Sequence, residues 1–354
     1  MNKFKTALLS GTFLSVAVLA ACDSDIDVDE LDEDDLNVGD SDAGDDEADD
    51  SDGDASSNGD SSQLQIGTGS TGGTYYALGQ EMANVISDNA DGVTVNAVST
   101  GASNENIARV HNGDLDLGMT VHIPALDALE GAGDFEGQGE FDQFGYMGYI
   151  YPETNQIAVR ADSGIESIED LEGMRVNLGP PNSASQSASL MILEAYGMTE
   201  DDIEVYEEGF GDGAGMLQDG NIDATFGLLG LPADNITELD SQIDIELLSI
   251  DEEALDTIEA NSMYERIVIP ADTYEFLEED VNAIAAYAVL IGSNETIDED
   301  LGYEITKALY ENAGSITHNQ GEHMEDTDNL LLGNEGLPMH PGAERYFEEA
   351  GLLN

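Results

Sequence analysis

The chain has 354 residues and is extremely acidic: 77 aspartate and glutamate residues against 8 lysine and arginine residues give a formal net charge of −69 at pH 7. A surface of this sign is a poor partner for nucleic acid and for anionic membrane surfaces, because both are themselves negative. Molar salt shortens the Debye length to roughly 3 Å and screens such self-repulsion, so the composition predicts a protein from an extreme halophile.

The first 22 residues have the pattern of an export signal. Lys3 and Lys5 give a basic start, and the apolar run 7–19 is too short to span a bilayer. The run ends in LAAC, and small residues before a cysteine are typical of the site at which bacterial lipoproteins are acylated. We therefore expect a lipoprotein signal peptide over 1–22, lipidation at Cys22, and an extracytoplasmic protein held at the membrane by its lipid. Cys22 is the only cysteine, which excludes internal disulfide bonds.

Residues 23–62 are predicted to be a disordered acidic tether. They hold 19 acidic residues and no lysine or arginine, so they bury too little apolar surface to fold and repel one another. The acids suggest a calcium loop of the EF-hand type, which needs glycine at its sixth position. That position is Val28 or Glu30, depending on the starting aspartate, so no metal site is predicted.

Residues 66–86 read IGTGSTGGTYYALGQEMANVI and predict a strand end, a glycine-rich loop and a helix. Tyr75, Leu78 and Met82 recur at helical spacing, which indicates one apolar face. The free N–H groups at the start of a helix, together with the positive end of its dipole, favour an anion. We therefore expect this loop to bind a small anionic group.

Two other interpretations of this loop remain open. Gly67, Gly69 and Gly72 fit the G-x-G-x-x-G pattern of dinucleotide-binding sites, which by itself is a weak signal. The next predicted strand, 93–100, ends in small and hydroxyl residues and not in the acid that binds a ribose, and no lysine follows Gly73. A purely structural turn is the other alternative. The pattern favours a small-molecule pocket, and no cofactor is predicted.

The rest of the chain alternates strands with helices, which is typical of an α/β fold with largely parallel sheets. Strands are predicted at residues 64–66, 93–100, 115–121, 144–151, 156–160, 175–178, 203–206, 224–229, 245–250, 266–269 and 283–291. Helices are predicted at residues 75–86, 103–110, 182–197, 214–218, 304–312 and 342–350, and another begins at residue 125. Ser103 or Asn104 is expected to cap one helix, and Asn182 or Ser183 another.

Three loops rich in glycine or serine follow predicted strands and open helices: 67–74, 100–104 and 179–185. In open α/β sheets a ligand lies beyond the carboxyl ends of the strands, where such loops gather. About 290 residues follow the tether, enough for two lobes. A ligand between the first two loops and the third would be enclosed by both lobes through a hinge-type closure.

Several stretches resemble one family. GTGSTGGTYYALGQEMA resembles the N-terminal signature of the TAXI family, the extracytoplasmic solute-binding proteins of tripartite ATP-independent periplasmic (TRAP) transporters. Later stretches resemble it in the same order: TGASNENI at 100–107, DLEGMRVNLGPPNSAS at 170–185, DGNIDATF at 219–226 and MHPGAERYFEEAG at 339–351. The resemblance covers residues 64–354. It implies capture of a small acidic solute, such as glutamate or a C4 or C5 dicarboxylate, and delivery to TRAP permease subunits for uptake driven by an ion gradient.

The expected fold is therefore a two-lobed, periplasmic-binding-protein-like (type II) α/β clamp with hinge-linked lobes. Lobe 1 is predicted over 63–155 and lobe 2 over 156–285, and residues 286–354 return to lobe 1 and form the C-terminal helices. The first crossing is expected at two strands separated by Pro152, and the return crossing at 283–291.

Few cations are available to bind an acidic solute, so backbone N–H groups, hydroxyls and amides must do most of it. The mature chain has Arg109, Arg160, Arg175, Arg266, Lys307 and Arg345. Of these, Arg175 is expected to form a structural ion pair. The predicted ligand-binding residues are Gly72, Gly73, Thr74, Tyr75, Ser103, Asn104, His122, Asn182, Ser183 and Ala184. For each donor a helix cap or a core contact is the alternative. His122 stands where the family commonly has a polar segment, and it is either a ligand contact sensitive to pH or a structural histidine.

No catalytic residue is predicted. The sequence has neither a G-x-S-x-G elbow nor an H-E-x-x-H motif, and its remaining histidines are scattered without metal-ligand spacing. Paired carboxylates are uninformative in so acidic a chain. The alternative to a transport protein is a lipoprotein sensor or adhesion module built on the same fold.

Overall fold

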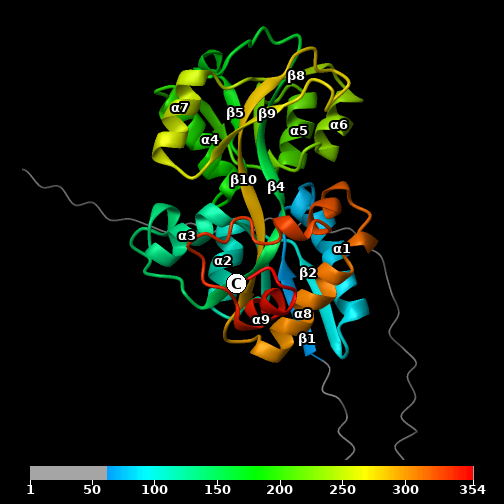
Figure 1. Cartoon of the computed structure of the whole chain (residues 1–354). Helices are drawn as coiled ribbons and strands as arrows, with labels where there is room; N and C mark the ends of the chain where they lie inside the picture. Colours follow the sequence, from blue (N-terminus) through cyan, green and yellow to red (C-terminus); the bar gives the residue numbers. More distant parts are fainter. Residues whose placement is uncertain (1–61, 354) are drawn as a thin grey trace, which may run out of the picture. The chain divides into compact units, whose positions relative to one another are not determined.

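The structure is a computed structural model that describes residues 62–353. The predicted signal peptide, the lipidation site Cys22 and, apart from Ser62, the acidic tether lie outside the described residues. Those residues form two α/β lobes, as Figure 1 shows, so the predicted two-lobed α/β fold is confirmed. Within residues 62–353, no helix combines the length and apolar character needed to cross a membrane.

A single ten-stranded sheet runs through both lobes. Its strand order is β2-β1-β3-β10-β4-β7-β5-β6, with β8 paired to β4 and β9 paired to β10. The strands are β1 (Ser62–Gly67), β2 (Val93–Val98), β3 (Leu117–Val121), β4 (Phe144–Arg160), β5 (Arg175–Asn177), β6 (Glu204–Tyr206), β7 (Ala224–Leu229), β8 (Ile245–Leu247), β9 (Glu265–Ile269) and β10 (Val281–Ser293). Parallel pairs join β1 to β2 and β3, and β5 to β6 and β7.

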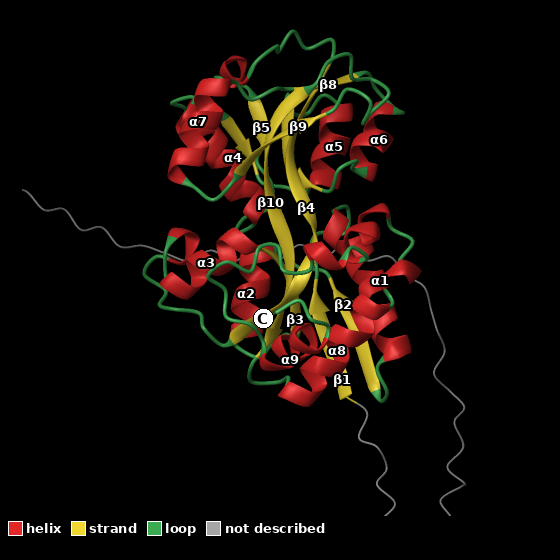
Figure 2. Ribbon diagram, viewed as in Figure 1, coloured by secondary structure: helices red, strands yellow, loops and turns green. Residues whose placement is uncertain are grey.

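Two long antiparallel strands, β4 and β10, connect the lobes, and Figure 2 shows them passing from one lobe into the other. β10 pairs with β9 from Val281 to Ala285 and with β3 from Ala288 to Gly292. β4 pairs with β10 from Phe144 onward and with β7 from Thr154. Because the two strands are hydrogen-bonded to each other where they cross, the connection between the lobes is a short sheet.

The prediction of two strands separated by Pro152 was wrong, because β4 is continuous. Pro152 lies opposite Tyr287 of β10, and the Tyr287 N–H donates to His122 Nδ1 on the far side of β10. The pair is therefore not a hydrogen-bonded one, and the missing N–H of proline removes no bond to β10. On its other edge β4 pairs with β7 only from Thr154, beyond the proline.

The helices of lobe 1 come from both ends of the described chain, which Figure 1 shows by their colours. They are α1 (Thr74–Asn89), α2 (Ser103–His111), α3 (His122–Glu130), α8 (Glu299–Glu311) and α9 (Pro341–Glu349). α1 fully buries Leu78, Met82 and Ile86, which confirms its predicted apolar face. α8 and α9 add Leu309 and Phe347 to the same core.

Lobe 2 has four helices: α4 (Ala184–Ala195), α5 (Phe210–Gln218), α6 (Asp234–Asp240) and α7 (Glu252–Asn261). α6 and α7 were not predicted, because their buried faces hold few apolar residues. In α7 the apolar face comprises Ala254, Leu255 and Ile258. The available signal was Asp251, whose carboxylate caps α7 by accepting from the Ala254 N–H.

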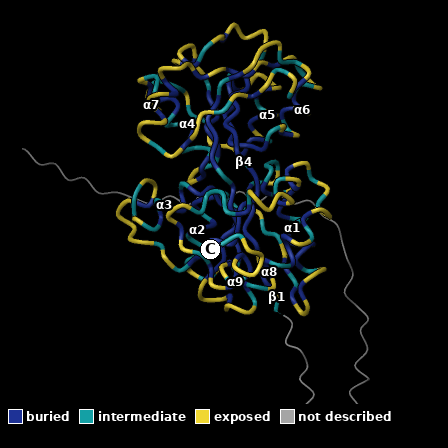
Figure 3. Tube along the Cα trace, in the orientation of Figure 1, coloured by how far each residue is buried: buried dark blue, intermediate teal, exposed yellow. Residues whose placement is uncertain are grey.

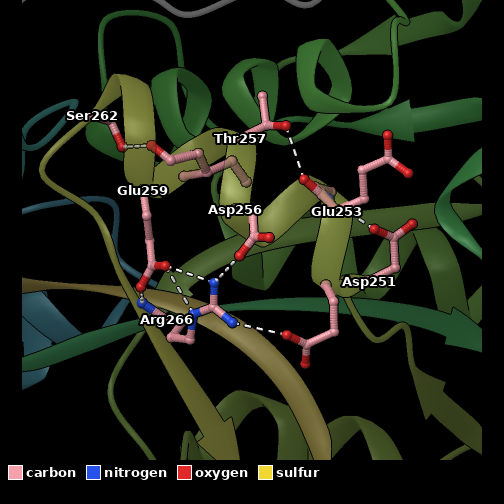
Figure 4. A network of polar contacts seen from close by, with 10 residues as sticks. Asp251, Glu253, Asp256, Thr257, Glu259, Ser262 and Arg266 are labelled. Carbon is pink, nitrogen blue, oxygen red and sulfur yellow. Dashed lines mark hydrogen bonds and ion pairs between the residues drawn. The ribbon is translucent and has the colours of Figure 1, made fainter.

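Ion pairs use all five arginines of the described chain, and they tie neighbouring elements together. Arg266 of β9 contacts three carboxylates of α7, Glu252, Asp256 and Glu259, at 2.8, 2.6 and 2.7 Å, and Figure 4 shows this cluster. The predicted structural pair of Arg175 is confirmed, since it contacts Asp223 at 2.7 Å. The remaining pairs are Arg109–Glu105, Arg160–Asp162, Arg345–Glu299 and Arg345–Asp300. The acids far outnumber these cations, and nearly all acidic residues of the described chain are exposed or half-buried, on segments that Figure 3 colours yellow and teal.

Candidate functional site

A cleft lies between the two lobes, with about 500 Å³ of empty space that includes its solvent-open mouth. Lobe 1 contributes the loops after β1 and β2, and lobe 2 contributes the loop after β5 and the start of α5. The β4 residues Tyr151 and Glu153 and the β7 residues Leu228 and Leu229 complete the lining. The carboxyl ends of strands from both lobes therefore meet at one cleft, as expected for an open α/β sheet.

The structure brings six of the ten predicted ligand-binding residues to this cleft. They are Gly73, Thr74, Tyr75, Ser103, Ser183 and Ala184. The other four, Gly72, Asn104, His122 and Asn182, do not line it. Gly72 lies in a separate groove with Gly211 and Asn235.

Two buried asparagines fix the loops that surround the cleft. Asn106 of α2 donates through Nδ2 to the carbonyl oxygens of Thr68 and Met119, at 2.7 and 2.8 Å, and so joins the loop after β1 to the middle of β3. Asn177 of β5 accepts from the Glu208 N–H at 2.7 Å and donates to Thr225 Oγ1 at 3.0 Å. Each asparagine bonds to polar groups that have no partner in the sheet, and it thereby holds the neighbouring loop in one position.

Four helices begin at the cleft, and three of them lack a side-chain cap. The N-cap residues of α1, α2 and α5 are Gly73, Ala102 and Gly209, and none forms a side-chain capping bond. The predicted capping of α2 by Ser103 or Asn104 was therefore wrong, because α2 already begins at Ser103. Ala102 has φ = 73° and ψ = −141°, a positive-φ conformation that costs a non-glycine residue energy and is common at functional sites. These helix starts present backbone N–H groups and positive dipole ends to the cleft.

Ser183 is the side-chain cap of the fourth helix, α4. Its hydroxyl accepts from the Gln186 N–H at 3.2 Å and donates to the Pro180 carbonyl oxygen at 2.7 Å. Ser103 differs, because its hydroxyl accepts from the Val121 N–H at 3.2 Å and lies beside the Tyr75 hydroxyl, with no bond to a backbone carbonyl. Of the two serines, Ser103 is therefore the better placed to donate to a ligand.

Replacing Ser183 with alanine is expected to lower the free energy of unfolding by about 1 kcal/mol, the usual cost of losing an N-cap. Urea denaturation in molar salt measures this change. The matched control is Ser183→Asn, which keeps a capping oxygen and should retain most of the stability. Equal losses in the two variants would show that the cap is not what Ser183 contributes.

Sequence reasoning missed Glu153, the most unusual residue of the cleft. Only 3% of its surface is exposed, and the Tyr151 hydroxyl donates to its Oε1 at 3.1 Å. The buried Tyr75 hydroxyl approaches the same carboxyl without a hydrogen bond of normal geometry. Burial raises the pKa of Glu153 to about 7, although the two tyrosines oppose this rise. The available signal was an acid inside an otherwise buried strand.

Asn155 adds further polar atoms to the same face of β4. Side chains alternate along a strand, so Tyr151, Glu153 and Asn155 point to one side of the sheet. Asn155 is 2% exposed, and neither its Oδ1 nor its Nδ2 has a hydrogen-bond partner among the described residues. Buried polar atoms normally have partners, so this strand face offers unused bonding capacity beside the cleft.

No lysine or arginine of residues 62–353 lines the cleft. The arginines are committed to the ion pairs described above, and Lys307 lies 5.6 Å from the centre of the Tyr303 ring on α8. Within the described chain, the charged side chain at the cleft is thus a carboxyl, and the positive potential comes from helix starts.

His122 begins α3, away from the cleft lining. Its Nδ1 accepts from the Tyr287 N–H at 3.2 Å, and its ring stacks at a tilt on the Tyr287 ring, with 5.3 Å between centres. Burial lowers the pKa of His122 to about 4, so the imidazole is neutral near pH 7. This geometry supports the structural interpretation of His122.

The lobes touch on both sides of the cleft. On one side the Asn235 amide of α6 donates to the Gly72 carbonyl oxygen. On the other side Asp134 Oδ2 accepts from Asn104 Nδ2 at 2.7 Å and from Ser187 Oγ of α4 at 2.6 Å. Asn104 therefore binds a lobe-bridging carboxylate. These contacts describe a closed arrangement of the lobes.

Comparison with solved structures finds distant likenesses. The alkanesulfonate-binding protein SsuA from Xanthomonas axonopodis pv. citri bound to MOPS is 18% identical, covers 81% of this chain and 83% of its own, and has a TM-score of 0.47. A putative L-cystine ABC transporter from Listeria monocytogenes is 16% identical, covers 77% of this chain and 97% of its own, and has a TM-score of 0.45. The arginine-, lysine-, histidine-binding protein ArtJ from Geobacillus stearothermophilus is 12% identical, covers 72% of this chain and 92% of its own, and has a TM-score of 0.44. At such low values, what those proteins bind says nothing about this chain.

The family comparison is stronger. Residues 66–351, from the end of β1 to just beyond α9, match the model of the NMT1-like family. The match includes both lobes and every loop that lines the cleft. Because it spans well over half of the sequence, the chain belongs to the NMT1-like family.

Proposed function

We propose that this protein captures a small extracellular solute between its lobes and delivers it to a membrane permease, without chemistry of its own. One observation carries the proposal: four helix starts from two lobes converge on one cleft, and three lack a side-chain cap. Uncapped N–H groups around a closable cleft suit a ligand that is bound, enclosed and released.

The solute is proposed to carry at least one carboxylate, as glutamate and C4 or C5 dicarboxylates do. The starts of α1, α2 and α5 would donate N–H groups to that carboxylate, and the Ser103 hydroxyl would add one bond. Each such charge-assisted bond contributes roughly 1.5–3 kcal/mol. Helix starts would thus replace the arginine that the cleft does not have.

The resemblance of the cleft loops to the TAXI family supports a TRAP permease as the partner and an ion gradient as the source of energy. The LAAC sequence supports a lipid anchor on Cys22, outside the cytoplasm. Gly67, the first glycine of the dinucleotide-like pattern, is buried, and a Cβ there would overlap the Asn106 side chain. That close approach explains why the position is glycine without a bound nucleotide, and it supports a site that has no nucleotide cofactor.

A thermal-shift screen tests the proposal. The purified protein is heated in 2 M KCl with glutamate, glutamine, 2-oxoglutarate, succinate, malate, fumarate, neutral amino acids or NAD. A ligand specific to the folded state adds about 2.7 kcal/mol at a hundredfold excess over Kd, which shifts the melting temperature measurably. A shift with an acidic metabolite supports the proposal, whereas a shift with NAD alone contradicts it. The same screen in 0.1 M KCl should give a lower melting temperature, as expected for adaptation to salt.

A further inference from the structure

The charged side chain at the cleft has the wrong sign for a carboxylate and the right sign for an ammonium group. We propose that Glu153 is the ammonium subsite of the cleft, so that the solute is an amino acid and not a dicarboxylic acid that lacks nitrogen. This inference rests on the proposed function and names the class of its solute.

The bonding of Glu153 leaves room for such a group. An ionised carboxylate offers about four acceptor sites. The Tyr151 hydroxyl uses one at 3.1 Å, and the Tyr75 hydroxyl approaches a second. Glu153 is nevertheless almost fully buried, and no cation of the described chain lies in the cleft. Burying a carboxylate without a counter-charge is costly, and an ammonium that donates to Glu153 would offset that cost.

The opposite end of the solute has donors waiting for it. Thr74 at the start of α1 and Ser103 at the start of α2 line the same cleft as Glu153. The N–H groups of the preceding residues, Gly73 and Ala102, are already bonded to the Ser70 carbonyl oxygen and the Thr100 hydroxyl. An α-amino acid carries a carboxylate and an ammonium on one carbon, and so fits a site with N–H donors on one side and a carboxylate on the other. A dicarboxylate would instead place a second negative group near Glu153, where like charges repel.

Unpartnered side chains beside Glu153 indicate where the solute makes its remaining bonds. The Tyr75 hydroxyl of α1 is buried between Glu153 and Ser103 and forms no hydrogen bond of normal geometry with either. Asn155, two residues beyond Glu153 on the same strand face, lies behind the lining of the cleft and has unpartnered amide atoms. An oxygen such as Asn155 Oδ1 accepts from an ammonium, which has three hydrogens to donate.

The groups that face Glu153 predict how the affinity depends on pH. They are Tyr75 of α1, Tyr151 of β4 and Tyr264 between α7 and β9, all neutral near pH 7. Burial raises the pKa of Glu153 to about 7, so its carboxyl is partly protonated near pH 7 when the cleft is empty. An arriving ammonium favours the carboxylate, and binding at pH 6 therefore releases a proton. The affinity should fall as the pH drops below 7, by up to about tenfold per pH unit.

Matched pairs of solutes test the proposal by calorimetry on the purified protein in 2 M KCl at pH 8. L-glutamate is compared with glutarate, L-aspartate with succinate, and each other standard amino acid with its deamino acid. We expect one or more amino acids to bind at least tenfold more tightly than the partner without nitrogen. Equal or tighter binding of glutarate or succinate would overturn the ammonium subsite and leave the proposed function standing. Binding of no solute would contradict both.

The Glu153→Gln variant tests the residue itself. Losing the charge should weaken amino-acid binding by about 10- to 150-fold and flatten the pH profile between 6 and 8. The matched control is Glu265→Gln, because Glu265 also accepts from a tyrosine hydroxyl, that of Tyr287, but lies outside the cleft. Unchanged affinity in Glu153→Gln would overturn the proposal. If that variant does not fold, the unmodified protein provides the test. Calorimetry at pH 6 in buffers of different ionisation enthalpy measures the protons released when the solute binds. Binding without proton release would overturn the proposal.

Discussion

Replacing Gly72 with valine is expected to weaken solute binding by about 5- to 150-fold while both lobes stay folded. Gly72 of lobe 1 faces Gly211 at the start of α5 in lobe 2, and a Cβ on Gly72 would lie 2.9 Å from the Gly211 Cα. Backbone atoms cannot yield as a flexible side chain can, so the lobes would have to separate. Overpacking typically costs about 1–3 kcal/mol, and here that cost falls on the closed arrangement alone. The closed, binding-competent fraction falls accordingly, and the apparent affinity falls with it.

Calorimetry gives the affinity of this variant, and urea denaturation shows whether it is folded. The matched control is Gly215→Val in α5, because a Cβ at Gly215 meets nothing within 4 Å. The control should bind solute as the parent does. Small-angle scattering should show the Gly72 variant more extended than the parent when solute is present. Parent-like affinity in Gly72→Val would mean that solute binding does not need the lobe contact seen here.

The solute-free protein is expected to lose on the order of 3 kcal/mol of stability through Glu153 as the pH rises from 4.5 to above 7. Burial raises the pKa of this carboxyl from 4.5 to about 7. Between those values the folded protein keeps a proton that the unfolded chain has lost, so the free energy of unfolding falls with rising pH. The contribution of Glu153 is fully present below pH 4.5 and is lost as the pH passes through 7.

Urea denaturation at pH 5 and pH 8, in the same molar salt, measures this effect. Other acids titrate over the same interval, so the quantity of interest is the difference between the parent and Glu153→Gln. Relative to the parent, the variant should gain about 2–3 kcal/mol between pH 5 and pH 8. An ammonium-bearing solute added at pH 8 should restore stability to the parent more than to the variant. A parent–variant difference that does not change with pH would show that the carboxyl is already ionised at pH 5 in the folded protein.

Much of the fold could be predicted from the sequence, because its signals are local. The apolar spacing of α1 recurs every three to four residues, and the strand at β7 was predicted with its actual bounds. Ser183 was expected as a possible cap and is one. The loops that line the cleft were recognised because glycine, serine and a following helix start stand next to one another in the chain. Helix starts, caps and strand ends depend on neighbours within a few residues, so the sequence determines them directly.

The site itself was decided by tertiary structure. With 77 acids in the chain, one acid within a strand is too weak a signal to single out Glu153. It becomes unusual because β4 continues through Pro152, crosses between the lobes and places that carboxyl beside Tyr75 of α1, which lies 78 positions earlier in the chain. The continuity of β4 depends in turn on Tyr287, which lies opposite Pro152 and donates its N–H to His122. Pro152 therefore sits where β4 needs no N–H to bond to β10. Burial and charge at one point of space are sums over residues far apart in sequence, and only the folded chain brings those residues together.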